Sequence, residues 1–135
     1  MIDKNKNNKK KMVLRTLAMP ANINVNGNIF GGWIMSQMDL GGAILAKEIA
    51  KGKVTTLKIE NMIFLKKIII GDLVSCYANC VSIGRTSMKV KVEMWIKKIS
   101  SEPFGDYFKT AKATFIYVAI DQDGNPRSIL NHSIS

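Results

Sequence analysis

One helical segment, residues 33–50, is followed along the chain only by segments of strand character, and this order constrains the fold more than any other feature. Its apolar residues recur at helical spacing and fill most of its faces: Ile34, Met35, Met38, Ala43, Leu45, Ala46 and Ile49. A helix that is apolar on most sides is a buried helix. The sequence therefore predicts one long helix at the centre of the domain.

Four long segments after the helix have the composition of β-strands: residues 53–68, 73–83, 86–99 and 107–120. The third alternates most clearly, because its Met, Val and Ile residues from 88 to 96 fall on even numbers, and Trp95 and most of its charged residues fall on odd ones. Turn residues separate the segments, and a shorter strand over residues 12–19 precedes the helix. We predict an α+β fold in which a curved antiparallel sheet of hairpin-connected strands wraps the helix.

The chain of 135 residues, 47% of them hydrophobic, is long enough for one domain with a single core. We assign residues 12–130 to this domain, residues 1–11 to a disordered tail rich in Lys and Asn, and residues 131–135 to a C-terminal tail. The first tail lacks the apolar region of a secretory signal, and no apolar stretch reaches the length of about 18 residues that a membrane span needs. We therefore expect a cytoplasmic protein with no membrane partner.

The formal net charge of +10 suits an anionic partner, such as nucleic acid, an acidic lipid or a phosphorylated molecule. Nucleic-acid binding by a sheet requires aromatic side chains interleaved with basic ones as stacking platforms. The sequence shows no such interleaving on any one strand face. We therefore predict that nucleic acid is not a partner.

Several kinds of catalytic site are excluded by the residue types of the chain. The one histidine, His132, lies in the predicted C-terminal tail, so neither a Ser-His-Asp nor a Cys-His arrangement has a well-placed imidazole. Cys76 and Cys80 would lie about 13 Å apart along one strand, which is too far for a disulfide. We expect two free thiols and no metal site, so that catalysis rests on carboxylates, amides and backbone dipoles.

Asp39 is the one carboxylate in the apolar part of the predicted helix. None of the residues three and four positions away is a cation, and Ser36, Gly42 and Ala43 are small enough to leave room beside the carboxylate for a ligand or water. A buried carboxylate needs a hydrogen-bonding or cationic partner. Asp39 is therefore either a functional group or a structural one that pairs with a polar group across a dimer interface. We expect a dimer, because a sheet covers only one side of an apolar helix.

Two further clusters have residue types that bind negative charge. Gly31 and Gly32 precede the predicted helix, where unpaired N–H groups and the helix dipole favour an oxyanion, although a plain loop explains this pair as well. The second cluster lies at a predicted hairpin and consists of Gly84, Arg85, Thr86 and Ser87. A guanidinium and two hydroxyls at a turn suit a phosphate, and a plain hairpin turn is the alternative.

The run NVNGNIFGGWIMSQMDLGGAILA, residues 24–46, together with GRTS, residues 84–87, and the strand order, resembles the hotdog-fold acyl-CoA thioesterases of the YciA type. The resemblance covers residues 12–130. It implies a hotdog fold, a dimer whose two sheets join edge to edge, assembly of such dimers as a trimer, and active sites at the subunit interface. It also implies hydrolysis of acyl-CoA to a free fatty acid and CoA without a cofactor, because CoA is part of the substrate.

The resemblance also implies roles for single residues. Asp39 would be the catalytic base or nucleophile, and Asn24 the catalytic amide of the loop. The backbone groups of Gly31 and Gly32 would form the oxyanion site. Residues 84–87 would contact the nucleotide part of CoA.

In one place the chain departs from the family, because Lys66 and Lys67 stand where Arg-Pro is common. The contacts made at this strand entry are therefore open. Two rival functions remain on the same fold. A dehydratase usually relies on a catalytic His, which the helix and its loop lack. A non-catalytic acyl-CoA-binding sensor would keep the pocket, and the intact Asn24 and Asp39 argue against it.

Overall fold

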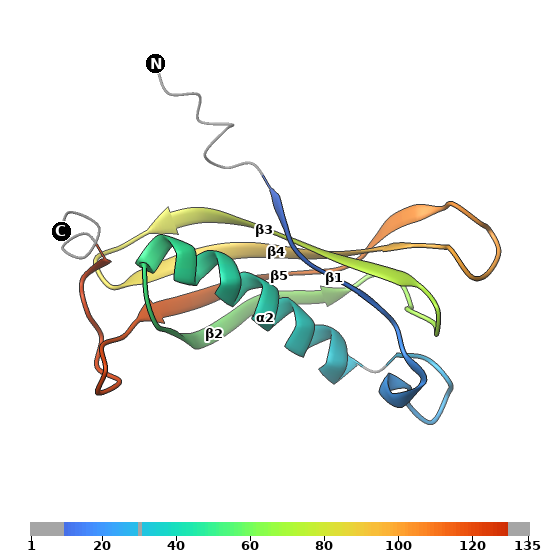
Figure 1. Cartoon of the computed structure of the whole chain (residues 1–135), viewed down its shortest axis with the longest axis horizontal. Coiled ribbons are helices and arrows are strands. Elements are labelled where there is room, and N and C mark those ends of the chain that lie inside the picture. Colours follow the sequence, from blue (N-terminus) through green and yellow to red (C-terminus); the bar gives the residue numbers. More distant parts are fainter. Residues whose placement is uncertain (1–9, 30, 130–135) are drawn as a thin grey trace, which may run out of the picture.

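The computed structural model describes residues 10–29 and 31–129. Its elements in chain order are β1 (Lys11–Leu17), the 3-10 helix η1 (Pro20–Asn22), α2 (Gly31–Ala50), β2 (Val54–Phe64), β3 (Leu73–Ile83), β4 (Ser87–Lys97) and β5 (Tyr107–Ala119). The five strands form one curved sheet that wraps one side of α2 (Figure 1). The predicted α+β architecture is confirmed. The predicted tails lie outside the described residues, except for Lys10 and Lys11, and β1 already begins at Lys11.

The strand order in the sheet is β1-β3-β4-β5-β2, and all neighbouring strands are antiparallel. Hairpins join β3 to β4 and β4 to β5, as predicted. The prediction of a hairpin between β2 and β3 is wrong, because β2 pairs with β5 at one edge and the connection, residues 65–72, crosses to the opposite half of the sheet. This connection buries Ile68 completely. A tight hairpin turn would expose that apolar side chain to water.

The core lies between α2 and the concave face of the sheet. The alternation predicted for β4 is confirmed, since its inward residues are all buried: Met88, Val90, Val92, Met94 and Ile96. The buried residues of the helix are Ile34, Met38, Gly41, Gly42, Leu45, Ala46 and Ala50. Met35 and Leu40, in contrast, are 36% and 51% exposed on the same helix. The sheet therefore covers one side of the helix, and the other side presents apolar groups to the surroundings of the single chain.

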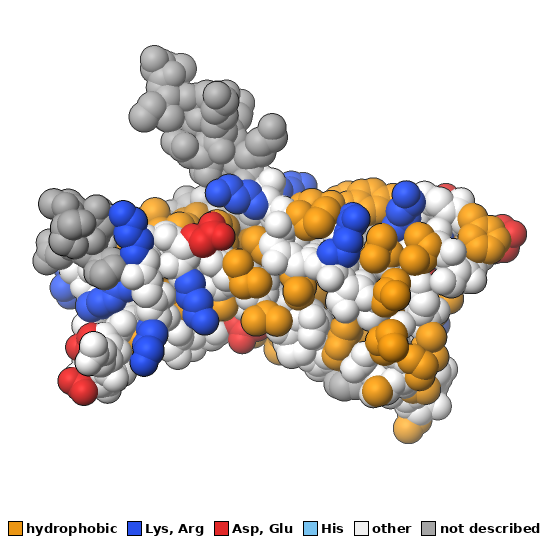
Figure 2. All heavy atoms as spheres, viewed as in Figure 1, with side chains coloured by type: hydrophobic (Ala, Val, Ile, Leu, Met, Phe, Trp, Pro, Cys, Tyr) orange, Lys and Arg blue, Asp and Glu red, His pale blue; other side chains and the backbone are white. Residues whose placement is uncertain are grey.

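The helix side of the molecule divides into two halves (Figure 2). Apolar side chains gather over the half in which α2 begins, whereas Lys and Arg side chains gather over the half in which it ends (Figures 1 and 2). The exposed apolar residues include Ile63 and Phe64, which end β2, and Leu65, which follows it. A contiguous apolar surface of this kind marks an interaction site. Within the described part of the chain, α2 and η1 are too short or too polar to cross a membrane.

The face of the sheet opposite to α2 carries aromatic and charged side chains. The Trp95 ring stacks on Tyr107 with centroids 4.9 Å apart, and the ammonium groups of Lys10 and Lys109 lie 5.8 and 5.6 Å from the Trp95 ring centre. Both lysines also form ion pairs with Glu93. Aromatic and basic side chains therefore do meet on this face, and the premise used to exclude nucleic acid is wrong. The absence of a nucleic-acid partner stays a prediction.

Candidate active site

Asp39 lies two turns into α2 and is partly buried. The Thr56 hydroxyl donates a hydrogen bond to Asp39 Oδ1 at 2.7 Å, and the Tyr117 hydroxyl lies 3.1 Å from the same oxygen and 2.8 Å from the Asp39 carbonyl oxygen. Across residues 10–29 and 31–129, no Lys or Arg forms an ion pair with this carboxylate. The partners of Asp39 are thus two neutral hydroxyls of its own chain, and Oδ1 needs no partner from across a dimer interface.

Thr56 and Tyr117 hold the Asp39 side chain, and the sequence did not indicate either of them. They are separated from Asp39 by 17 and 78 positions along the chain, so no local motif connects the three. The two residues are direct cross-strand partners in the β2–β5 ladder, and such partners point to the same face of a sheet. Only the pairing of β2 with β5, which differs from the predicted order of hairpins, places both hydroxyls under α2.

Gly41 and Gly42 let α2 approach the sheet closely. A Cβ atom at Gly42 would overlap the Tyr117 hydroxyl, and one at Gly41 would lie 2.7 Å from Cys76 Sγ and 2.9 Å from Val13 Cγ2. The expectation that small residues here leave room beside the carboxylate for a ligand is therefore wrong at Gly42. The sequence showed the missing side chains, but not that side chains from the sheet fill the space.

A pocket of about 340 Å³ opens at the start of α2 and brings Asn24 and Gly31 together. Asn24 Oδ1 accepts hydrogen bonds from the backbone N–H groups of Asn26, at 2.9 Å, and Asn28, at 3.2 Å, which fixes the shape of the loop. The Nδ2 group makes no hydrogen bond to any described residue, so it is the part of the amide that is available to a ligand. Gly32 is exposed beside Gly31. The predicted amide and oxyanion groups thus lie at one place.

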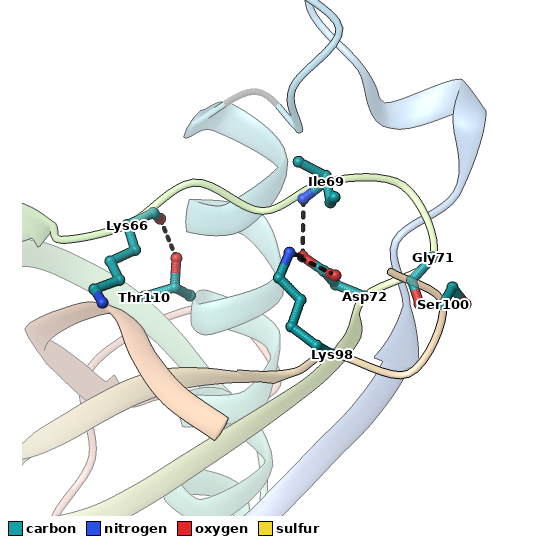
Figure 3. A network of polar contacts seen from close by, with 7 residues as sticks. All are labelled: Lys66, Ile69, Gly71, Asp72, Lys98, Ser100 and Thr110. Carbon is teal, nitrogen blue, oxygen red and sulfur yellow. Dashed lines mark hydrogen bonds and ion pairs between the residues drawn. The ribbon is translucent and has the colours of Figure 1, made fainter. Parts of the chain in front are cut away.

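The opposite wall of this pocket is formed by residues 64–68. Thr110, which is completely buried, fixes the first half of the wall (Figure 3). Its hydroxyl donates to the Lys66 carbonyl, and its own carbonyl accepts hydrogen bonds from the N–H groups of Leu65, at 2.7 Å, and Lys66, at 3.2 Å. In the connection, these contacts use only backbone groups, those of Leu65 and Lys66. The departure from Arg-Pro at this strand entry therefore does not remove them.

A buried ion pair fixes the second half of the same connection (Figure 3). The Asp72 carboxylate is fully shielded from solvent. One of its oxygens accepts a hydrogen bond from the Ile69 N–H at 3.0 Å, and each oxygen lies 3.1 Å from Lys98 Nζ. Between the two anchors, the Ile68 carbonyl accepts a hydrogen bond from the Ile29 N–H at 2.9 Å. This bond joins the wall to the loop that carries the catalytic amide candidate.

The turn predicted to contact CoA, residues 84–87, lies at the other end of the molecule. A hydrogen bond of 2.7 Å from the Gly84 N–H to the Ser87 carbonyl closes the turn, and the Arg85 side chain is exposed. Figure 1 shows this β3–β4 turn beside the end of α2, whereas the Asn24 loop lies at its start. A helix of 20 residues is about 30 Å long. One chain therefore does not bring the two groups of residues together.

Asp39 is also separated from the start of α2. At a rise of about 1.5 Å per residue, Asp39 lies about 12 Å along the helix axis from Gly31. A reacting carbonyl needs an attacking group within about 3.5 Å of its carbon, with the oxyanion donors at a similar distance from its oxygen. A single chain thus does not place the predicted base and the predicted oxyanion groups at one thioester.

Cys76 and Cys80 are free thiols, as predicted. Burial raises the pKa of Cys76 to about 12 and also raises the pKa of Cys80, so neither is a thiolate nucleophile near neutral pH. In the described ranges, no group of three or more His, Cys, Asp and Glu residues is arranged to hold a metal ion. His132 lies outside those ranges.

The sequence and the fold both resemble those of known proteins. The family model of the thioesterase superfamily matches residues 26–102. An uncharacterized acyl-CoA thioester hydrolase of Buchnera aphidicola subsp. Baizongia pistaciae is 60% identical over 131 residues, which cover 97% of each chain. The acyl-CoA thioester hydrolase YciA of Escherichia coli K12 is 58% identical over 118 residues, which cover 87% of this chain and 89% of the relative.

Among solved structures, the aspartate-to-alanine variant of a hexameric broad specificity acyl-coenzyme A thioesterase superposes with a TM-score of 0.87. It is 55% identical in sequence, and the match covers 88% of this chain and 86% of the other. The hotdog fold that the resemblance implied is confirmed. The chain belongs to the thioesterase superfamily and, within it, to the YciA-type acyl-CoA thioester hydrolases.

Proposed function

We propose that this chain hydrolyses acyl-CoA thioesters to a free carboxylic acid and CoA, an activity of fatty acid metabolism. The observation that carries the proposal is the environment of the Asp39 carboxylate. Two neutral hydroxyls contact one of its oxygens, and no Lys or Arg of the described residues forms an ion pair with it. Such a carboxylate is suited to act as a general base or a nucleophile. The names and identities of its relatives support the same activity.

In the proposed reaction, Asp39 takes a proton from water while the water oxygen bonds to the thioester carbon. The oxyanion that forms accepts hydrogen bonds from the backbone N–H groups of Gly31 and Gly32, and the Asn24 amide orients the carbonyl or the water. The C–S bond then breaks, CoA leaves as a thiolate that takes up the proton, and the acyl group leaves as the acid. A thiolate is a good leaving group, so a site without His suffices. Direct attack by Asp39, followed by hydrolysis of the anhydride, is the other route through the same residues.

Two chains complete each site in this proposal. The distance of about 12 Å between Asp39 and Gly31 along one helix is too long for one thioester, so Asp39 of one protomer works with the Asn24 pocket of its partner. The exposed apolar surface over the start of α2 supports a close dimer. The solved relative is hexameric, which is compatible with three such dimers. We propose this trimer of dimers for the present chain.

The nucleotide part of CoA is bound, in our proposal, by the turn at residues 84–87. The Arg85 guanidinium is exposed there and suits a phosphate, and the positive net charge of +10 would raise the rate of encounter with the anionic substrate. Arg85→Ala should raise KM for CoA esters with little effect on kcat. An unchanged KM would remove Arg85 from the site. The free thiols Cys76 and Cys80 support a cytoplasmic, reducing compartment.

The function is tested by following thiol release from a series of acyl-CoA esters of increasing chain length, with the wild type and Asp39→Asn in parallel. Release by the wild type alone is the expected result and also ranks the chain lengths. Equal release by both proteins would remove Asp39 from the chemistry. Binding of acyl-CoA without release by either protein would make the chain an acyl-CoA-binding sensor.

Shared sites are tested by mixing two inactive variants. In a mixed dimer of Asp39→Asn and Asn24→Ala chains, one of the two sites would combine an intact Asp39 with an intact Asn24. Thiol release should therefore reappear after the two proteins are unfolded together and refolded, but not after each is refolded alone. No recovery, with mixed dimers demonstrated by mass spectrometry, would place both residues of a site in one chain.

A further inference from the structure

We propose that Tyr117 is a positioning residue for Asp39. Its hydroxyl packs against Gly42 and holds Oδ1 of Asp39, so that Oδ2 is the oxygen that reacts. The inference rests on the proposed function, in which Asp39 is the base or nucleophile. It adds a residue from β5, which neither the sequence motif nor the helix itself indicates, and it assigns different tasks to the two oxygens of one carboxylate.

The Tyr117 hydroxyl contacts two oxygen atoms of Asp39. It lies 2.8 Å from the Asp39 carbonyl oxygen and 3.1 Å from Oδ1, so its single proton is shared between backbone and side chain. The phenol ring is completely buried and is stacked with Phe115 at 6.1 Å, which leaves the hydroxyl little freedom. Burial raises the pKa of Tyr117, and the charge of Asp39 and the hydrogen bond to it raise this pKa further. The hydroxyl therefore remains a donor throughout the working pH range.

The two oxygens of Asp39 have different surroundings. Thr56, at 2.7 Å, and Tyr117, at 3.1 Å, both contact Oδ1. No described residue donates a hydrogen bond to Oδ2. A carboxylate oxygen that already accepts hydrogen bonds has fewer lone pairs free for a new proton or bond, whereas the unoccupied oxygen keeps them. Oδ2 is therefore the atom that is free to meet water or the thioester carbon.

The contact between Tyr117 and Asp39 requires a residue without a side chain at position 42. A Cβ atom at this position would overlap the Tyr117 hydroxyl, and it would lie 3.1 Å from two of the ring carbons. Glycine is among the least favourable residues in a helix interior, so local helix stability does not explain its presence here. The missing side chain creates a notch in α2, and the phenol oxygen occupies that notch.

Tyr117→Phe removes the hydroxyl and keeps the buried ring. We expect kcat for acyl-CoA hydrolysis to fall about 10-fold or more, with KM changed less than about twofold, because the variant loses the orientation of Asp39 and not substrate contacts. Tyr107→Phe is the matched control, since its hydroxyl bonds to Tyr77 on the opposite face of the sheet and its loss should leave kcat unchanged. A Tyr117→Phe enzyme with wild-type kcat would overturn the proposal.

A second pair of variants separates positioning from general damage. Gly42→Ala should lower kcat by displacing the Tyr117 hydroxyl. In the Tyr117→Phe background the added methyl group meets no hydroxyl and only the two ring carbons at 3.1 Å, so Gly42→Ala should slow this variant much less than it slows the wild type. Two effects that multiply would show that Gly42 and Tyr117 act independently, and would overturn the proposal. This test also holds if Tyr117→Phe lowers the melting temperature.

The outcome is distinguishable from a failure of the proposed function. If the wild type releases no thiol, or if Asp39→Asn is as active as the wild type, then the function or the role of Asp39 is wrong, and Tyr117 has no reaction to serve. If the wild type is active, Asp39→Asn is inactive and Tyr117→Phe equals the wild type, then only the present inference fails.

Discussion

Two aspartates of this chain are held in opposite ways. Asp72 is completely buried, and each of its oxygens faces the Lys98 ammonium while one also accepts the Ile69 N–H. Asp39 is partly buried, has only neutral hydroxyls as partners, and has both of them on Oδ1. The first carboxylate has its charge and its lone pairs satisfied by the fold. The second keeps an oxygen and a charge that the described fold does not use.

The partners of a carboxylate indicate whether its role is structural or chemical. A fully partnered one fixes the conformation of the chain, and Asp72 fixes the connection that forms one wall of the Asn24 pocket. A carboxylate with an unused oxygen contributes less to folding and remains available for chemistry. Loss of Asp39 should therefore appear in kcat, and loss of the partners of Asp72 in the free energy of unfolding.

The largest expected effect is on catalysis. Asp39→Asn should lower kcat for acyl-CoA hydrolysis by about 10²-fold or more, because the amide is neither a base nor a nucleophile. Its side-chain oxygen still accepts from Thr56 and Tyr117, so the free energy of unfolding should change by less than about 1 kcal/mol. Steady-state kinetics and chemical denaturation of the same preparation check both parts. A large loss of stability would show that Asp39, like Asp72, is a structural group.

The largest expected effect on stability follows the removal of Lys98. Lys98→Met leaves the Asp72 charge buried without a counter-ion, and this should lower the free energy of unfolding by about 3–5 kcal/mol. Lys97→Met, at the exposed neighbouring position, is the control. The double change Asp72→Leu with Lys98→Met removes both charges and should recover part of the loss, as denaturation curves would show. Equal stability of Lys98→Met and the control would mean that the ion pair does not stabilise the connection.

The two helix glycines offer a smaller and sharper contrast. Gly41→Ala places a Cβ atom 2.7 Å from Cys76 Sγ and 2.9 Å from Val13 Cγ2, which should cost about 1–3 kcal/mol of stability. The better helix propensity of Ala offsets about 1 kcal/mol of this. We expect kcat to stay near the wild-type value for Gly41→Ala and to fall for Gly42→Ala. If both substitutions lower kcat equally, the notch at Gly42 has no special role.

The smallest expected effect concerns a third carboxylate, on the outer face of the sheet. Partial burial raises the pKa of Glu93, but hydrogen bonds from Trp95, Lys10 and Lys109 outweigh it and lower the pKa from 4.5 to about 2. The stabilisation that these contacts give is therefore present above pH 4.5 and is lost as the pH falls towards 2. At neutral pH it amounts to about 1 kcal/mol.

This third case is tested by denaturation of the wild type and Glu93→Gln at several pH values. The wild type should be the more stable protein at neutral pH, and the difference should shrink as the pH falls through the interval from 4.5 to 2. Asp123→Asn, in an exposed loop, is the control. Parallel stability curves for the wild type and Glu93→Gln would mean that the surrounding lysines do not hold the Glu93 charge.

Much of the fold was predictable because it follows from local patterns. The inward residues of β4 alternate with polar ones, and this pattern placed them in the core correctly. The same reasoning placed strand 73–83 at the observed bounds of β3 and the helix within two residues of its observed start. It failed at the pairing of β2, because alternation says which face of a strand is buried but not which strand lies beside it.

The candidate site was predictable to the same extent. A carboxylate in an apolar helix is unusual enough to make Asp39 a candidate from the sequence, and the motif around it adds Asn24 and the glycines as candidates. The partners Thr56 and Tyr117 carry no such signal, because hydroxyl residues are common in strands. The misreading of Gly42 has the same origin, since a missing side chain does not say whether water, substrate or a neighbouring residue fills the space.

The sequence by itself determined the buried helix, the strands, the isolated carboxylate and the family, because each depends on residues close together in the chain. The tertiary structure alone decided which oxygen of Asp39 is free and how far Asp39 lies from the loop of Asn24. Those properties depend on the β2–β5 ladder, which joins residues 17 and 78 positions away from Asp39. Contacts over such separations are set by the packing of α2 on the sheet, and no local pattern encodes them.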